Sequence, residues 1–498
     1  MYNSLNLIFI PLDNRPVSYT LPAQIASLNK NIKTYLPPRE FLGGLVKDSD
    51  ADKIIEWLEK TLAENDIHYI AVSLDTIAYG GLIPSRRSRE SFHEIIHGLE
   101  KFRRAVEKNR AKIFAFSSIM RISDSYVNEE EKEYWDRFGK EIFRYSYLKH
   151  KVSAELPAFP EKYRDELELL EKTIPQEIIE DYKKTRERNF SINRFYLKWI
   201  EDGFLDFLAF SKDDTGEYGF NIQETEALNC EIKDKNLSDK VLIQTGADEI
   251  PCGLISRIIT NHYREKIKIF PVYSTPNGKN IISRYEDKTI SENASGQIKL
   301  CGADAACSET DADIILLLHT PENVQNDHCL NIHTEPENIE AINFCTEYIK
   351  NSKKPVIIAD ISSANGADNK FVMQILANGV DLNKIYGYAG WNTTGNTLGS
   401  VISAGISRFI AEKQNSFNMN NFKKLLLVRL SDDWAYQTVT RQKIRAITDL
   451  ADKITLKEEL IPLVLNISKK IDYDLCISNL RVSFPWSRTF EVEIDLFD

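Results

Sequence analysis

Short apolar runs recur along this chain, and longer amphipathic stretches separate them. The runs are rich in Ile, Val, Leu and Phe and are almost continuously apolar, which is typical of strands covered on both faces. Strand and helix patterns that alternate at this spacing indicate repeated βαβ units. The runs that predict strands lie at residues 5–12, 69–74, 113–117, 205–210, 241–244, 267–273, 313–318, 355–359 and 384–389.

Polar residues crowd the carboxyl ends of these runs. Ligands bind at the carboxyl ends of the strands in α/β folds, so we expect these side chains to form one rim around a substrate. An Asp alone could equally cap the helix that follows it, but arginine, tyrosine and tryptophan side chains are not caps. The residues predicted to bind substrate are Asp13, Arg15, Asp75, Tyr79, Arg121, Asp248, Asp360, Asn365, Trp391, Asn392 and Asn396.

The fold that explains one such rim best is a (β/α)8-like, TIM-type barrel with a helical insertion and a C-terminal α/β extension. The predicted catalytic domain spans residues 1–400 of the 498-residue chain. A highly charged, helical insertion near 125–200 is a candidate lid or homo-oligomer surface. Residues 401–498 are predicted as a mostly helical extension packed on the barrel. Alternation at 490–495 predicts a final edge strand.

Charge and composition limit the partners of the chain. A net charge of −11 without a basic block argues against binding to nucleic acid or to a membrane surface. The seven cysteines contain no CxxC pair, which favours reduced thiols in a cytoplasmic protein. The apolar run at 5–12 is too short for a signal peptide, and no run of about 18 apolar residues would span a membrane.

The strongest chemical motif is Lys212-Asp213-Asp214-Thr215-Gly216, which directly follows an apolar run. Two carboxylates in one cavity repel, so that one pKa rises and the other falls. This separation provides the acid and the charged group that glycoside hydrolysis needs. We therefore predict Asp213 and Asp214 as catalytic residues. The alternative is a solvated turn, since Asp-Asp-Thr-Gly is also common turn sequence.

A second motif surrounds Trp391, within residues 388–397. An indole ring can cover the C–H face of a sugar, and the amides of Asn392 and Asn396 can fix its hydroxyl or acetamido groups. The alternative is a core tryptophan beside a helix N-cap made by Thr or Asn. Together the two motifs predict a small carbohydrate substrate.

Familiar cofactor and metal motifs are missing from the sequence. No P-loop, no GxGxxG after the first run, no GxSxG and no HExxH occurs, so we predict neither a cofactor nor a catalytic metal. The eight histidines are scattered, and only His319 follows a predicted strand. A structural role for His319 is favoured over a metal-binding one.

Several motifs together resemble a bacterial family of domains of unknown function over nearly the whole chain. They are PLDNRP, LDTIAYGGLIPSR, KDDTG, GADE, ANGADN, GWNTTGNTLG and the terminal FPWSRTFE. Locally, the Asp-Asp pair with a late Trp-Asn motif is similar to retaining β-N-acetylhexosaminidases that use substrate assistance. This resemblance implies that Asp213 orients the acetamido group of a GalNAc or GlcNAc substrate and that Asp214 is the general acid. Lys212 and Thr215-Gly216 differ from the better-known families.

Three other functions remain open on the sequence. An ordinary glycosidase would use a second carboxylate at Asp75, Asp248 or Asp360. A non-catalytic sugar-binding protein would use the acids only as hydrogen-bond acceptors. A metal-dependent hydrolase would use Asp13, Asp75 and Asp360 as ligands.

Overall fold

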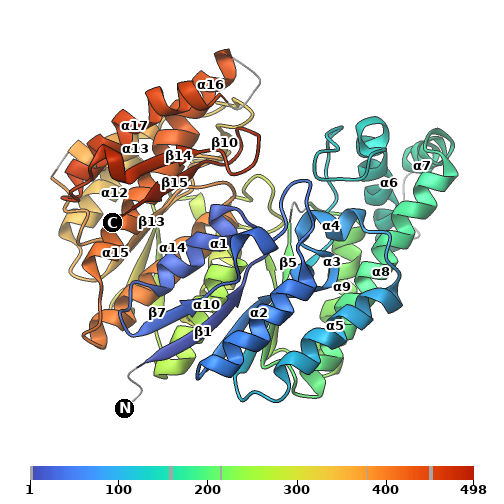
Figure 1. Ribbon diagram of the computed structural model, residues 1–498. Helices are drawn as coiled ribbons and strands as arrows, with labels where there is room; N and C mark the ends of the chain where they lie inside the picture. The colour runs from blue at the N-terminus through green and yellow to red at the C-terminus, as the bar shows by residue number, and fades with distance from the viewer. Residues whose placement is uncertain (1–3, 156–160, 214–215, 378, 448–451, 498) are drawn as a thin grey trace. The chain divides into compact units, whose positions relative to one another are not determined.

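The computed structural model describes residues 4–155, 161–213, 216–377, 379–447 and 452–497, and it shows helices alternating with strands (Figure 1). The chain divides into two compact units. Unit 1 comprises Met1–Asn6, Arg15–Thr34 and Asp248–Asp498, and unit 2 comprises Leu7–Asn14 and Tyr35–Ala247. Residues 401–498 therefore belong to the same unit as residues 248–400, whereas the sequence placed a boundary between them.

Every predicted apolar run contains a strand. In the first sheet the order is β2-β1-β3-β4-β5-β6, and the pairs from β1–β3 to β5–β6 are parallel. Its inner strands β3 and β5 are buried along their whole length, as the near-continuous apolarity requires. The strands are β1 (Leu5–Ile10), β2 (Ile32–Tyr35), β3 (Tyr69–Ser73), β4 (Lys112–Ile119), β5 (Phe207–Lys212) and β6 (Val241–Thr245).

A second parallel sheet lies in unit 1, with the order β13-β11-β9-β7-β8. Its central strands β9 and β11 are buried along their whole length. The strands are β7 (Lys268–Tyr273), β8 (Asp304–Ala305), β9 (Ile314–His319), β11 (Val356–Asp360) and β13 (Gly387–Ala389). Two short strands, β10 (Asn326–Asp327) and β12 (Ser363–Ala364), pair separately.

The predicted eight-stranded barrel is not what the strands form; they build two separate parallel sheets. Apolar runs show that a strand is covered on both faces, but they do not show which strand lies next to it. In the first sheet, β2 lies on one side of β1 and β3 lies on the other. In the second sheet, β8 lies on one side of β7 and β9 lies on the other. Chain connections therefore diverge between β1 and β3 and between β7 and β9, and such switch points are where open α/β sheets bind ligands.

The helical insertion predicted near 125–200 is present in unit 2. Its helices α6 (Trp135–Glu155), α7 (Glu161–Thr173) and α8 (Gln176–Glu201) follow β4. Trp135, Ile142 and Tyr182 belong to a small apolar core within this insertion. The other helices of unit 2 are α2 (Ala51–Glu64), α3 (Leu74–Tyr79), α4 (Leu82–Arg87), α5 (Phe92–Val106) and α9 (Phe220–Asp234).

In unit 1, helices α1 (Pro16–Ala26), α10 (Ile250–Tyr263) and α14 (Thr394–Lys413) lie side by side (Figure 1). Helix α14 packs on β11 and β13, and Gly405 faces Ile357 there so closely that a Cβ atom would collide with its Cγ2. The remaining helices of unit 1 up to this point are α11 (Ile290–Leu300), α12 (Ile339–Asn351) and α13 (Asn369–Ala377).

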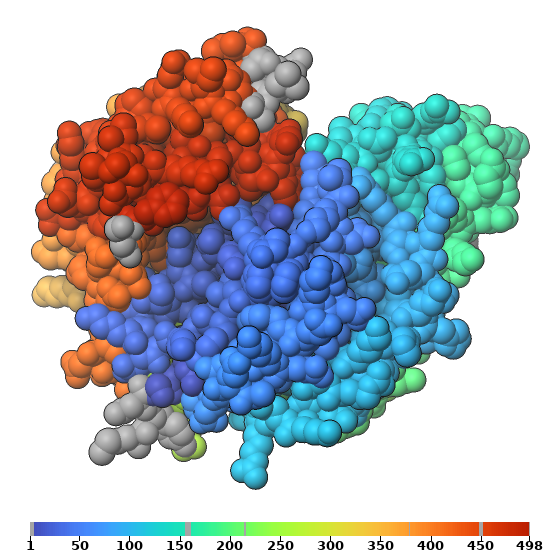
Figure 2. Space-filling model, in the orientation of Figure 1, coloured from blue at the N-terminus to red at the C-terminus, as the bar shows by residue number. Residues whose placement is uncertain are grey.

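The C-terminal part of the chain, orange to red in Figure 2, is mostly helical, as predicted. Helix α15 (Met419–Leu430) continues into a π-helix, η3 (Ser431–Thr440), and then into α16 (Arg441–Ile447). After α17 (Lys453–Lys470), the strands β14 (Leu480–Ser483) and β15 (Glu493–Leu496) form an antiparallel pair. The final strand confirms the alternation seen in the sequence. Long π-helices are rare and frequently accompany functional sites.

Candidate functional site

The predicted site residues are divided between the two units. Unit 2 contains Asp13, Asp75, Tyr79, Arg121 and Asp213. Asp214 lies outside the described residues. Unit 1 contains Arg15, Asp248, Asp360, Asn365, Trp391, Asn392 and Asn396. The structure thus shows two polar sheet edges in place of the single rim expected from the sequence.

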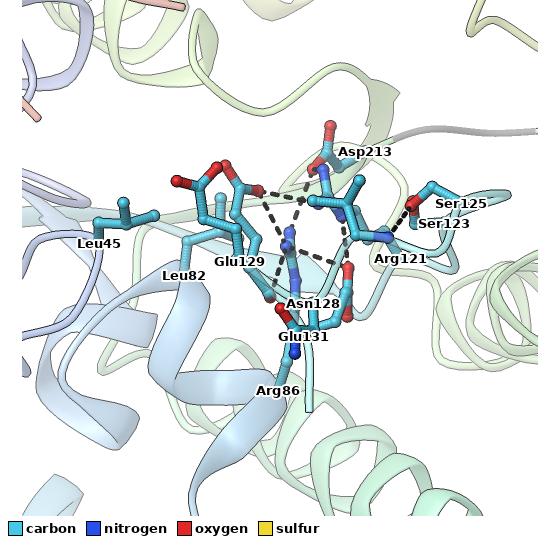
Figure 3. Close-up of polar contacts among 12 residues, drawn as sticks. Leu45, Leu82, Arg86, Arg121, Ser123, Ser125, Asn128, Glu129, Glu131 and Asp213 are labelled. Atoms are coloured by element: carbon cyan, nitrogen blue, oxygen red, sulfur yellow. Dashed lines mark hydrogen bonds and ion pairs between the residues drawn. The ribbon is translucent and has the colours of Figure 1, made fainter. Parts of the chain in front are cut away.

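At the edge of unit 2, Asp213 follows β5 and is held by two arginines. Its Oδ2 accepts hydrogen bonds from Nη2 of Arg86 at 3.2 Å and from Nη1 of Arg121 at 3.3 Å. Arg121 follows β4, the neighbouring strand, and Arg86 lies in the last turn of α4. Both guanidinium groups are directed towards Asp213 (Figure 3). The carboxylate is 22% exposed, whereas the Arg86 side chain is 1% exposed.

Two further acids complete this cluster. Arg121 contacts Glu130 at 2.8 Å and Glu131 at 3.0 Å, and Arg86 lies 3.4 and 3.5 Å from the same two carboxylates. Three carboxylates thus surround two guanidinium groups, and a third arginine, Arg87, donates to the carbonyl of Glu131 at 2.8 Å. Buried charges persist only when they are paired in this way. We call the three acids and the two arginines that they surround the Asp213 cluster.

Asp75 follows β3, the strand that pairs with β4, and it is 1% exposed. Its Oδ1 accepts a hydrogen bond from the Ser117 hydroxyl at 2.7 Å, and its Oδ2 accepts one from the Ser118 backbone N–H at 2.8 Å. Burial raises the pKa of Asp75 to about 6, although these hydrogen bonds and the charge of Arg86 act to lower it. The carboxyl group therefore changes its charge near neutral pH.

The two other predicted residues of this edge are buried. Asp13 follows β1 and is 4% exposed. The loop after β1 is tied to the start of α3, because the Thr76 hydroxyl donates to the carbonyl of Pro11 at 2.6 Å. The phenol of Tyr79 has no hydrogen-bond partner among the described residues, and burial raises its pKa well above the ordinary value.

At the edge of unit 1, Asp360, His319 and Asp368 form a connected buried network. Nε2 of His319 lies 3.2 Å from Oδ2 of Asp368, whose backbone N–H donates to Oδ2 of Asp360 at 2.8 Å. Burial raises the pKa of Asp360 to about 6. Burial alone would lower the pKa of His319, but the hydrogen bond to Asp368 and the charge of Asp360 raise it well above its ordinary value.

Nε2 of His319 faces Asp368, and Nδ1 lies 3.5 Å from the Ser274 hydroxyl. The order Ser–His–Asp resembles a hydrolytic triad, but 3.5 Å exceeds the roughly 2.6–3.2 Å expected between a nucleophile and its base. His319 instead connects the ends of β7 and β9 with the start of α13, in agreement with the structural role favoured from the sequence.

The π-helix η3 supplies a second buried group at this edge. Asp433 accepts a hydrogen bond from the Gly390 backbone N–H at 2.8 Å and pairs with Arg429 at 3.1 Å. Burial raises the pKa of Asp433, and the neighbouring Asp432 acts in the same direction. The Asp433 carbonyl also accepts the N–H of Ala367. These bonds fix η3 against the loops that follow β11 and β13.

The remaining predicted residues of unit 1 lie in packed surroundings. Arg15 forms a bidentate pair with Asp248, at 2.6 and 3.2 Å. Trp391 is 4% exposed and meets Phe490 edge to face, which favours the core alternative over a sugar platform. Asn392 has a φ of 59°, and its carbonyl accepts the N–H of Asn365 at 2.8 Å.

Asn396 and Asn365 use their side chains within the loops. The Asn396 amide donates to Thr393 Oγ1 at 3.1 Å in the first turn of α14. The Asn365 amide donates to both oxygens of Asp327 at 3.2 Å. Asparagines of this kind shape the loops, as the N-cap alternative suggested.

Several residues of the two sites were not among the predicted site residues, namely Arg86, Glu130, Glu131, Asp368, Arg429 and Asp433. Arg86, in α4, and Asp368, just before α13, do follow strands in the sequence, within PSR and GADN, so their position was a usable signal. Glu130 and Glu131 lie in a charged run with no such signal. No group of three or more His, Cys, Asp or Glu among the described residues is arranged to hold a metal ion.

Comparison with known proteins gives a family but no activity. The model of a family described as "Protein of unknown function (DUF4127)" matches residues 7–495. No match to the chain is found among curated proteins or among solved structures. Of the helices in the described ranges, none is long and apolar enough to cross a membrane.

Proposed function

The chain belongs to this family of unknown function, and we propose from its own side chains that it is a glycoside hydrolase acting on a β-linked N-acetylhexosamine. The observation that carries the proposal is the fixed carboxylate of Asp213 at the carboxyl end of β5. Its Oδ2 is taken by two guanidinium groups, whereas its Oδ1 has no hydrogen-bond partner among the described residues (Figure 3). An oriented carboxylate with one available oxygen suits contact with a sugar.

Substrate assistance requires a charged group beside the acetamido nitrogen. The cyclised intermediate carries positive charge, and a preorganised negative group stabilises it most when it does not need to move. Arg86 and Arg121 hold the carboxylate of Asp213 in place. In this proposal Asp213 orients the substrate, and its neighbour Asp214 protonates the leaving oxygen.

The ordinary two-carboxylate glycosidase is the second candidate, and the pKa of Asp75 favours it. A carboxyl group with a pKa of about 6 is protonated often enough to act as a general acid. However, both oxygens of Asp75 are already bonded and its side chain is buried. The role of Asp75 in this alternative therefore requires the start of α3 to move away from β4. A sugar-binding protein without catalysis is the outcome if no glycoside is cleaved.

The experiment is a screen of aryl β-glycosides, with and without a 2-acetamido group, against wild type, Asp213→Asn and Asp214→Asn. We expect cleavage only of the N-acetyl substrates. Asp213→Asn should slow all of them by roughly 100-fold or more, since it removes charge stabilisation of the transition state. Asp214→Asn should slow poor leaving groups most. Asp165→Asn, an exposed acid on α7, is the matched control.

A thiazoline mimic of the cyclised intermediate distinguishes the two mechanisms. We expect it to inhibit wild type strongly, because transition-state-like ligands bind more tightly than substrates. Equal cleavage of glycosides with and without the acetamido group, together with no inhibition by the thiazoline, would contradict substrate assistance. Loss of activity in Asp75→Asn would then point to the two-carboxylate mechanism.

A further inference from the structure

The helical insertion of unit 2 contacts the loop that begins at Asp213. This loop leaves β5 and enters α9 at Phe220. At its far end, each residue from Glu217 to Phe220 contacts a side chain of α6, the first helix of the insertion. The insertion itself precedes β5 in the chain. The end of the loop is therefore held from outside, by a segment that the chain builds between β4 and β5.

The start of α9 receives its cap from α6. The first N–H groups of a helix have no acceptor within the helix, and the side chain just before it usually supplies one. In α9 this position is occupied by Gly219, which has no side chain. The Ser146 hydroxyl of α6 accepts the N–H of Phe220 at 2.7 Å. Ser146 is fully buried, so that its hydroxyl serves this bond away from solvent.

His150 of α6 supplies a second acceptor. Its Nδ1 accepts the N–H of Gly219 at 3.2 Å, and its Nε2 lies 3.2 Å from Oε2 of Glu226 in α9. Because a backbone N–H only donates, Nδ1 carries no proton, and the ring proton on Nε2 is donated to Glu226. The imidazole is buried and meets the ring of Tyr218 edge to face. These contacts fix both the tautomer and the orientation of the ring.

Aromatic side chains extend the same attachment. The Tyr147 hydroxyl donates to Oε2 of Glu217 at 3.3 Å. The ring of Tyr147 also meets Tyr218 edge to face, with 5.3 Å between the ring centres, and Tyr145 meets Phe220 in the same way at 6.0 Å. Polar and apolar contacts thus act together on the same four residues of the loop.

We propose that α6 fixes the far end of the loop between β5 and α9, and that His150 is a positioning residue for the acids that this loop carries. The proposal rests on the proposed function, in which Asp213 orients the substrate and Asp214 protonates the leaving oxygen. Two arginines hold Asp213 at the near end, and α6 holds the far end. A misplacement of about 1 Å in a catalytic group can lower the rate roughly 100-fold, so both ends matter.

Hydrogen–deuterium exchange of the full-length protein measures this attachment independently of activity. Both His150→Leu and His150→Asn lose the contact with Glu226, but Asn carries Oδ1 on the atom that carries Nδ1 in histidine. We expect the Gly219 amide to exchange roughly tenfold faster in His150→Leu and at nearly the wild-type rate in His150→Asn. Ser146→Ala should accelerate the Phe220 amide to a similar extent.

Arg137→Gln, at an exposed position of α6, controls for general loosening of the helix and should leave both amides unchanged. Equal exchange of the Gly219 amide in His150→Leu and His150→Asn would overturn the role of His150. Wild-type exchange of the Phe220 amide in Ser146→Ala, together with wild-type exchange of the Gly219 amide in His150→Leu, would overturn the attachment as a whole.

The glycoside screen tests the catalytic part of the proposal. His150→Leu should lower kcat about tenfold for poor leaving groups at an unchanged KM, because a displaced acid protonates the leaving oxygen less well. Activated aryl leaving groups should be cleaved at nearly the wild-type rate, and His150→Asn should restore kcat. Equal losses for good and poor leaving groups would overturn the positioning role. If wild type cleaves no glycoside while the exchange rates change as expected, the attachment stands and the proposed function alone fails.

Discussion

At the end of β3, the carboxyl group of Asp75 is almost completely buried, yet it has a hydrogen-bond donor for each oxygen. The position of Asp75 at a strand end was predicted correctly, because the sequence itself shows an acid directly after an apolar run. Its bonding to Ser117 was not predictable, since that contact joins residues 42 positions apart. The same holds for Asp213, whose bond to Arg86 spans 127 positions.

Replacing Asp75 by Asn should make the stability of unit 2 less dependent on pH. The folded pKa of about 6 exceeds the unfolded value of 3.8, so the folded state holds its proton more tightly. Stability therefore falls as pH rises from about 4 to 6, by about 3 kcal/mol in total. Asn avoids this cost, because its oxygen can accept from Ser118 and its amide can donate to Ser117.

Denaturant titrations of wild type and Asp75→Asn at pH 4 and pH 7 measure this difference. We expect the two proteins to be similar at pH 4 and the variant to be the more stable at pH 7. Asp165→Asn on α7, which keeps Asp75, should match wild type at both pH values. A variant less stable than wild type at pH 7 would mean that the charged form of Asp75 is favoured in the folded state.

Among the elements, the helices and strands follow from the sequence better than their arrangement does. Each apolar run forms a strand, and the charged region near 125–200 forms helices. The pairing of β1 with β3, or of β9 with β11, depends on contacts that no local pattern encodes. For this reason the same apolar runs are compatible both with the expected barrel and with the observed pair of sheets.

Two glycines test how closely the elements pack. At Gly405 of α14, an added Cβ would collide with Ile357 of β11, which is fully buried. Gly405→Ala should destabilise unit 1 by about 1–2 kcal/mol, since overpacking outweighs the gain in helix propensity. Gly98 of α5 has no atom within 4 Å of an added Cβ. Gly98→Ala should therefore stabilise the protein by about 0.5–1 kcal/mol.

Thermal unfolding of both alanine variants beside wild type gives the comparison. Opposite shifts of the melting temperature are expected from the two substitutions. If both variants were equally stabilised, α14 would have to be able to move away from β11 at little cost.

At the scale of the whole molecule, unit 1 is assembled from segments that are far apart in the sequence. Helix α1, near the N-terminus, supplies Val17, Leu21 and Ile25 to the apolar core of this unit. The Ser407 hydroxyl of α14 donates to the carbonyl of Ile25 at 2.7 Å. No change in composition and no linker indicates that α1 belongs with residues 248–498. The boundary predicted from the sequence was therefore placed at residue 400.

A fragment of residues 248–498 should therefore fold poorly, because it lacks the helix that covers part of its core. We expect it to be aggregation-prone and to lack a cooperative unfolding transition. Co-expression with a peptide of residues 15–34 should restore solubility and a cooperative transition, as measured by circular dichroism on heating. Cooperative unfolding of the fragment alone would show that α1 is dispensable.

The discontinuity of unit 1 also has a consequence during translation. Unit 2 is complete when residue 247 has left the ribosome. The helices α10 and α14, against which α1 packs, have not yet been synthesised at that point. Roughly 200 residues separate the two parts, which corresponds to about 10–40 s of synthesis at ~5–20 residues per second. Throughout that interval the apolar face of α1 has no partner within unit 1, which leaves it open to a chaperone.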